Sequence, residues 1–176
     1  MPLTGEVVFW FTLPTSHGRM MILFRRFCLV QILLLWQGGF LFYTSVVVPT
    51  GTQVLGSPAS QGVITARVTD VLNLIGVVGV AVFAWELNYS RDRDPRRTAI
   101  RWWCWAVMLV CQWLLFYSHQ LLDAFMDPER TCVVIRPLFY PMHRVYLWTI
   151  TVQWFSCLIL TGLTIAAWRA EDRQNR

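Results

Sequence analysis

The sequence contains no lysine and carries little charge of any kind. Its 15 basic residues are all arginine, and Asp, Glu, Lys and Arg together make up 14% of the 176 residues, whereas soluble domains average about 25%. Hydrophobic residues make up 56% of the chain, and the mean hydropathy is +0.47. This composition argues against a water-soluble globular fold and predicts an integral membrane protein.

The motifs of common enzyme classes are also missing. The sequence has no G-x-S-x-G nucleophile motif, no phosphate-binding P-loop and no G-x-G-x-x-G dinucleotide motif. None of its five cysteines forms a C-x-x-C or zinc-ribbon spacing, and four of them lie inside apolar runs, where a free cysteine behaves as a small hydrophobic residue. We therefore assign no catalytic residue and expect a non-enzymatic membrane component.

Four apolar runs are long enough to cross a bilayer, which takes about 20 apolar residues per helix. They predict an all-α fold, an integral membrane four-helix bundle formed as a single domain over residues 25–176. The helices are expected at about 27–48, 68–87, 102–122 and 146–168.

The segments outside these runs are predicted to be non-helical. Residues 1–24 read as an N-terminal extension, disordered or lying at the membrane interface, and translation could begin at Met1, Met20 or Met21. Proline and glycine in 49–62, and the lack of helix signals in 127–142, predict turn-rich loops on one side of the membrane.

The arginines are distributed unequally about the predicted helices. Eleven flank one side of the membrane and four flank the other, so the positive-inside rule predicts an inner (plasma) membrane protein with both termini in the cytoplasm. Because the arginines flank apolar runs, we expect the lipid bilayer as the partner, together with other membrane subunits, and no nucleic acid. The minority group is Arg67, Arg130, Arg136 and Arg144.

Burying a polar or ionisable side chain in a membrane-spanning helix costs free energy, so each such residue is expected to have a bonding partner or a functional role. Gln112, His119 and Asp123 share one helical face by their spacing, and so do Asp70 and Asn73. With the predicted topology, Asp70, Asn73, His119 and Asp123 fall near the outer ends of their helices, as do Tyr43, His143 and Tyr146. We therefore predict one polar cluster inside the bundle, formed by Tyr43, Asp70, Asn73, Gln112, His119, Asp123, His143, Arg144 and Tyr146.

Three interpretations of this cluster stay open from the sequence. In the first, the polar groups only hold helices together through hydrogen bonds. Alternatively, His119 and His143, expected within about 10 Å of each other, are candidate cofactor ligands that could bind a b-type haem axially. With Asp123 or Cys132, the same histidines could hold copper or zinc.

Two glycines lie in an otherwise bulky apolar run of the second predicted helix. Gly76 and Gly79 are expected where a neighbouring helix approaches closely, because membrane helices gain stability from close backbone packing.

Several segments resemble a known group of proteins. FYTSVVVPTGTQVLG, TARVTDVLNLIG, SHQLLD and FYPMHRVYLWTITVQW, within about 36–172, are similar to bacterial four-helix membrane proteins of the domain of unknown function 4149 family. Eukaryotic relatives of that family are called transmembrane protein 205. The resemblance implies a four-helix integral membrane protein without an established activity, and it assigns no catalytic residue.

Overall fold

The structure is a computed structural model that describes residues 16–90, 92–127 and 132–174. Four of its helical segments are long and apolar enough to cross a membrane: Met20–Leu55, Pro58–Tyr89, Pro95–Ala124 and Pro137–Gln174. The described chain is all-helical apart from one short strand pair, which confirms the predicted all-α class with four long helices.

The first of these segments is built from consecutive helical pieces and is called the first span below. It comprises α1 (Ser16–Leu33), η1 (Leu34–Gly38), α2 (Gly39–Phe42), η2 (Tyr43–Val47) and α3 (Val48–Leu55), where η1 and η2 are π-helical turns. The other helices are α4 (Pro58–Tyr89), α5 (Pro95–Ala124) and α6 (Arg136–Gln174). Strands β1 (Met126–Asp127) and β2 (Cys132–Val133) pair in antiparallel fashion between α5 and α6.

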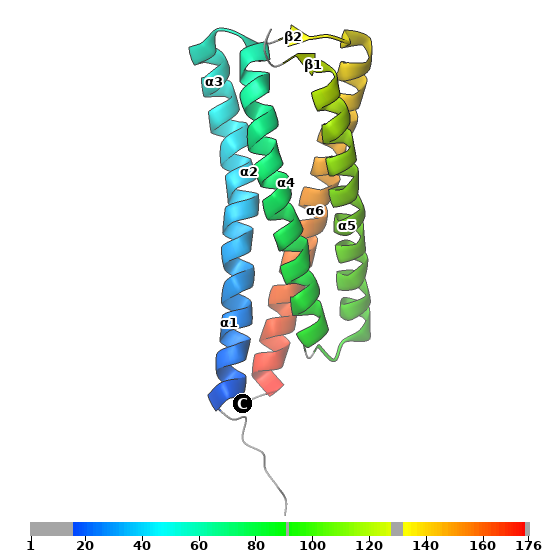
Figure 1. The fold of residues 1–176 in the computed structure, drawn as a ribbon. Helices are drawn as coiled ribbons and strands as arrows, with labels where there is room; N and C mark the ends of the chain where they lie inside the picture. The colour runs from blue at the N-terminus through cyan, green and yellow to red at the C-terminus, as the bar shows by residue number, and fades with distance from the viewer. Residues whose placement is uncertain (1–15, 91, 128–131, 175–176) are drawn as a thin grey trace, which may run out of the picture.

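The helices form an elongated bundle in which α6 crosses from one neighbour to another (Figure 1). The first span begins and α6 ends at the same end, which we call the termini end. The opposite end carries α3, β1 and β2 and is called the strand end. At the strand end α6 lies beside α5, whereas at the termini end it approaches α1, where Arg26 bonds to Asp172. The first span and α6 are therefore drawn together at the termini end.

The helices extend further than the sequence predicted: they occupy most of the first expected loop, 49–62, and the last part of the second, 127–142. Helix α3 continues to Leu55, and only Gly56, with a left-handed φ of 63°, and Ser57 separate it from α4. The other expected loop, 127–142, contains β2 and the first turns of α6. Pro49 is tolerated because it lies in the first turn of α3, directly after the π-helical turn η2.

Helix starts are set by local capping chemistry. The Ser57 side chain accepts a hydrogen bond from the Ser60 amide before Pro58 opens α4. Asp94 accepts from the amides of Arg96 and Arg97 at the start of α5. At the N-terminus, α1 runs without interruption through position 25, so the predicted boundary there falls inside a helix. Residues 1–15 of the predicted extension lie outside the described residues.

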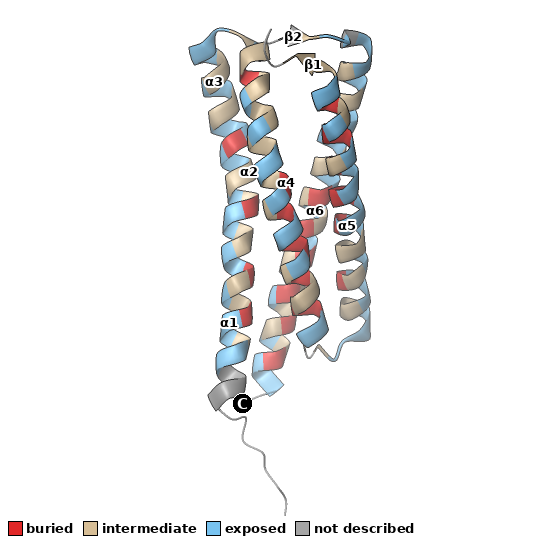
Figure 2. Cartoon of the chain, in the orientation of Figure 1, coloured by how far each residue is buried: buried red, intermediate tan, exposed pale blue. Residues whose placement is uncertain are grey.

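Buried residues concentrate on the inner faces of the helices (Figure 2). The larger cluster lies toward the termini end and draws on the first span, α4, α5 and α6. The smaller one lies toward the strand end and consists of Leu115, Leu122 and Tyr146. The larger cluster contains Leu29, Trp36, Val80, Phe83, Leu87, Met108, Cys157 and Leu160.

Gly76 and Gly79 provide the space in which Trp36 of the first span packs. A Cβ atom on Gly79 would lie 2.7 Å from Cε3 of Trp36, and one on Gly76 would lie 2.5 Å from Oε1 of Gln112 and 3.2 Å from Nε1 of Trp36. The distances of 2.7 and 2.5 Å are shorter than real Cβ atoms adopt. The predicted close approach of a neighbouring helix at these glycines is confirmed.

Candidate functional site

A group of three polar residues joins α4 to α5 toward the strand end. The Nε2 atom of His119 lies 2.7 Å from Oδ1 of Asp70 and 3.6 Å from Oδ2 of Asp123. His119 and Asp123 are one turn apart on α5, while Asp70 reaches across from α4. The imidazole is buried, whereas the two carboxylates are 49% and 46% exposed. We call these three residues the Asp–His–Asp triad.

The triad offers a set of metal-ligating atoms. One ligand atom from each of its three residues lies within 4.8 Å of the others, and imidazole nitrogen with carboxylate oxygen suits zinc and other first-row metal ions. The guanidinium of Arg67 is 4.0 Å from Asp70 and largely exposed, so it neutralises this group only weakly. The side chain of Cys132, the other predicted ligand, lies outside the described residues.

A cavity of about 300 Å³ lies between the first span, α4 and α6. It includes four members of the predicted cluster, Tyr43, Asn73, His143 and Tyr146, but its walls are mainly apolar and aromatic. The lining residues are Trp36, Gln37, Phe40, Tyr43, Thr44, Val48, Thr65, Thr69, Leu72, Asn73, His143, Tyr146, Leu147, Ile150, Gln153 and Trp154.

Four polar atoms of this lining are buried without a hydrogen-bond partner among the described residues: Oε1 of Gln37, Nδ2 of Asn73, Oη of Tyr146 and Nε1 of Trp154. An unpaired buried polar group is costly, about 1–3 kcal/mol each, and native structures rarely leave one unexplained. Unpaired buried atoms also occur in charged groups at the other end of the bundle, but those of Arg25, Glu86 and Arg101 belong to ion pairs, whereas the four atoms here belong to uncharged residues that line a single cavity.

Other polar groups around the cavity are already paired and fix its walls. Nε2 of Gln112 donates to the backbone carbonyl of Asn73 at 3.2 Å, and Nε2 of Gln153 donates to Oε1 of Gln112 at 3.0 Å. Nearer the strand end, the Tyr43 hydroxyl donates to Oγ1 of Thr65 at 3.1 Å. These bonds connect α4 to α5, α5 to α6 and the first span to α4, so the cavity wall is held from three sides.

The structure divides the predicted polar cluster into two groups. Asp70, His119 and Asp123 form the triad, whereas His143 is exposed, stacks on Phe139 with ring centroids 5.7 Å apart, and lines the cavity. Tyr146 lies between the two groups, with its ring centroid 6.4 Å from that of His119. Arg144 is exposed and forms no hydrogen bond or ion pair with either group among the described residues.

The arrangement does not suit an axially ligated haem. Both imidazoles would have to present a nitrogen to one iron, but His119 is not part of the cavity wall that His143 lines. A haem between His119 and His143 therefore does not fit the residues present.

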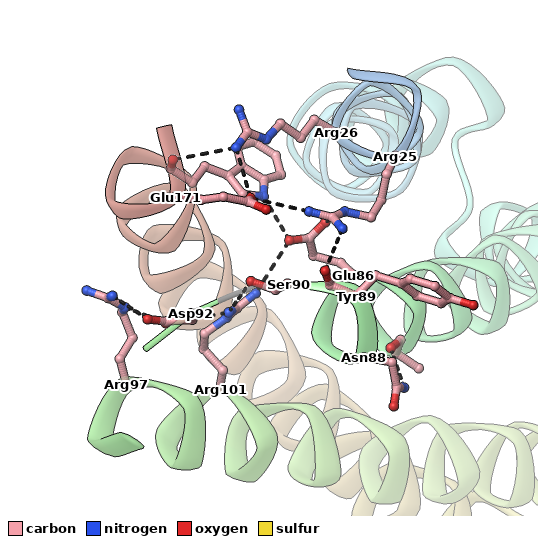
Figure 3. A network of polar contacts seen from close by, with 12 residues as sticks. Arg25, Arg26, Glu86, Asn88, Tyr89, Ser90, Asp92, Arg97, Arg101 and Glu171 are labelled. Atoms are coloured by element: carbon pink, nitrogen blue, oxygen red, sulfur yellow. Dashed lines mark hydrogen bonds and ion pairs between the residues drawn. The ribbon is translucent and has the colours of Figure 1, made fainter. Parts of the chain in front are cut away.

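A buried ion-pair network at the termini end was missed by the sequence analysis (Figure 3). Nε of Arg25 lies 2.7 Å from Oε2 of Glu86, and Nη2 of Arg101 lies 3.6 Å from Oε1 of the same carboxylate. Glu86 also accepts from the indole of Trp168 at 2.8 Å. Glu86 and Arg101 are 0% and 1% exposed. We call this group, with Arg26, Asp92, Arg97, Glu171 and Asp172, the termini network.

The termini network connects all four long helices. Arg25 and Arg26 of α1 both contact Glu171 of α6, at 3.5 and 3.1 Å. Arg101 of α5 reaches Asp92, in the connection that precedes α5, at 3.7 Å. The sequence analysis used these arginines only to predict the membrane orientation. Glu86 could have indicated the network, because an isolated carboxylate at the end of an apolar run needs a basic partner.

At the edge of the termini network, Asp92 is also paired with Arg97, whose Nε lies 2.6 Å from Oδ2 of Asp92. This hydrogen bond to the Arg97 guanidinium holds the pKa of the Asp92 carboxyl below its ordinary value. Asp92 therefore stays ionised and compensates Arg101 and Arg97 at the end of the bundle.

Comparisons with known proteins add no relative. No family model matches the chain, and neither a curated protein nor a solved structure does. The resemblance to the domain of unknown function 4149 family stays a prediction, and function has to be argued from the site.

Proposed function

We propose that this chain is a non-enzymatic, multi-pass protein of the inner membrane that binds a small amphipathic molecule in the cavity between its first span and α6. The observation that carries this proposal is the set of four unpaired buried polar atoms in one mainly apolar cavity. Such a combination, apolar walls with a few placed polar groups, is typical of small-molecule sites.

The shape of the bundle supports this assignment. The first span and α6 are joined by ion pairs at the termini end, while the cavity separates them further along. Because the cavity lies between two candidate membrane spans, its ligand is expected to enter from the bilayer, where amphipathic molecules concentrate.

Thermal unfolding with added ligand tests this function. The purified protein in detergent is mixed with neutral amphiphiles that share a decyl tail, at matched mole fraction in the micelle. A ligand at 100 times its Kd stabilises the folded state by about 2.7 kcal/mol, so at least one should raise the Tm by several degrees.

A cavity-filling variant and a matched control complete the experiment. Leu147→Trp places a large side chain in the cavity wall and should abolish the Tm rise. Leu158→Trp, on the same helix but outside the lining, should respond as the wild type does. If no decyl amphiphile raises the Tm, or if both variants retain the rise, the proposed function is wrong.

The orientation is part of the proposal and rests on eleven arginines against four. Reporter fusions after Arg176 and near Asp94 should indicate the cytoplasm, whereas a fusion at Gly56 should indicate the outside. A periplasmic signal from Arg176 would reverse the orientation and place the cavity in the inner half of the membrane.

The triad supports a second candidate function, binding of a divalent metal ion. Its three ligand atoms within 4.8 Å are the specific observation. Equilibrium dialysis against Zn²⁺ should show one bound ion, lost in His119→Gln and Asp123→Asn but retained in His143→Gln. Retention in His119→Gln would contradict a site at the triad.

A further inference from the structure

The cavity lining carries no permanent charge. None of its sixteen residues is Asp, Glu or Arg, and His143 is the one side chain there that ordinarily changes charge near neutral pH. A charged head group would therefore lack a fixed counter-ion in apolar surroundings, which is strongly disfavoured. The lining therefore favours a ligand with an uncharged head group.

Of the four unpaired atoms in the lining, three can donate a hydrogen bond and only Oε1 of Gln37 is purely an acceptor, so they favour a ligand that accepts hydrogen bonds. Nδ2 of Asn73 donates, and the hydroxyl of Tyr146 can donate as well as accept. Asn73 is 4% exposed and Tyr146 is 8% exposed. The Asn73 and Tyr146 side chains interact with each other, but without good hydrogen-bond geometry, and neither atom has another partner among the described residues. Two adjacent donors match the two lone pairs of one carbonyl oxygen.

The position of these donors also orients the ligand. Leu147 and Ile150 continue the cavity wall along α6 from Tyr146 and provide an apolar surface for a tail. Trp154, the other free donor on α6, lies eight residues from Tyr146, about 12 Å along the helix axis. A single head group bound at Tyr146 and Asn73 does not reach Trp154.

From these observations, and resting on the proposed function, we infer that the ligand is a neutral amphiphile whose head carries a carbonyl oxygen that accepts hydrogen bonds from Tyr146 and Asn73. Its alkyl portion lies along Leu147 and Ile150. Esters and alkyl quinones share this chemistry, since their heads accept hydrogen bonds and do not donate them.

A head-group series at constant tail length tests the inference. The probes are methyl decanoate and decyl-1,4-benzoquinone, which only accept, decylbenzene, which neither accepts nor donates a conventional hydrogen bond, and decylamine and decanoate, which are charged at pH 7. Apparent Kd values come from Tm titrations of the purified protein at matched micelle mole fraction. The two carbonyl probes should bind about tenfold more tightly than decylbenzene and the charged probes, the scale of one or two buried hydrogen bonds.

Variants then locate the head group. Tyr146→Phe should weaken the carbonyl probes about tenfold and leave decylbenzene within twofold, because only the hydrogen bond to the carbonyl oxygen is lost. Trp154→Phe removes an unpaired donor about 12 Å away and should preserve the carbonyl preference. Tyr117→Phe, on an exposed tyrosine that stacks on Trp113, controls for the loss of a hydroxyl.

The outcomes separate this inference from the function on which it rests. Equal binding of all neutral probes, still lost in Leu147→Trp, would overturn the carbonyl head and keep the cavity as a ligand site. Loss of the preference in Trp154→Phe and not in Tyr146→Phe would overturn the assigned head position. Absence of binding by every probe would overturn the proposed function as well.

Discussion

The two halves of the bundle solve the problem of buried polarity in opposite ways. At the termini end, the buried carboxylate of Glu86 has two guanidinium groups and an indole within reach. Toward the strand end, four buried polar atoms around the cavity have no partner in the described chain, and the triad carboxylates are about half exposed. Charge is thus compensated by ion pairs at the termini end, where some guanidinium nitrogens also lack a hydrogen bond with good geometry, whereas the cavity half leaves uncharged polar groups unpaired.

The apolar packing differs in the same direction. The larger core cluster extends from the termini network to Trp36, which packs against Gly76 and Gly79 and also forms part of the cavity wall. The smaller cluster lies nearer the strand end. A bundle whose helices are fixed at one end can hold a cavity near the other without losing its register. We infer that the termini half supplies stability and the strand half supplies the ligand site.

The largest effect is expected from breaking the termini network. Glu86→Ala leaves Arg25 and Arg101 buried without their shared carboxylate, which should destabilise the fold by about 3–5 kcal/mol. Thermal unfolding in detergent measures this loss. Asn88→Ala, on the same helix with its side chain bonded only within that helix, should change stability little. Similar losses in the two variants would mean that the network contributes no stability.

A smaller but clear effect is expected where the first span packs on α4. Gly79→Leu forces a side chain into the ring of Trp36 and should cost about 1–3 kcal/mol. The neighbouring Val78 is 46% exposed, so Val78→Leu should be nearly neutral in the same unfolding assay. If the two variants were equally stable, Gly79 would not face the first span.

The smallest effect concerns Asp92 at the edge of the network, and it depends on pH. Its pKa is lowered in the folded protein, so its stabilisation is complete above the unfolded pKa of about 3.9 and is lost as pH falls through the folded value. Asp92→Asn should therefore lower the Tm at pH 7, by the equivalent of up to about 1 kcal/mol, and the difference should shrink in acid. Asp94→Asn retains a capping side chain and serves as the control. A Tm difference independent of pH would contradict the ionic origin.

Part of the candidate site could be predicted from the sequence because helical spacing is a local property. The i,i+4 spacing of His119 and Asp123 placed them on one face, and matching depth in the predicted topology brought Asp70 to them. The same depth argument placed His143 with His119, but depth does not fix rotation about the helix axis. The structure turns His143 toward Phe139 and the cavity instead.

The sequence by itself determined that the chain forms four long apolar helices, because the length of each run and its low charge are properties of the run alone. It also marked Gly76 and Gly79 as points of close approach. Only the tertiary structure decided that Arg25, Glu86, Arg101 and Glu171 meet in one buried network, and that Asn73, Tyr146 and Trp154 face one cavity. These contacts join residues far apart in the chain, so they depend on how α6 crosses the bundle, which no local pattern encodes.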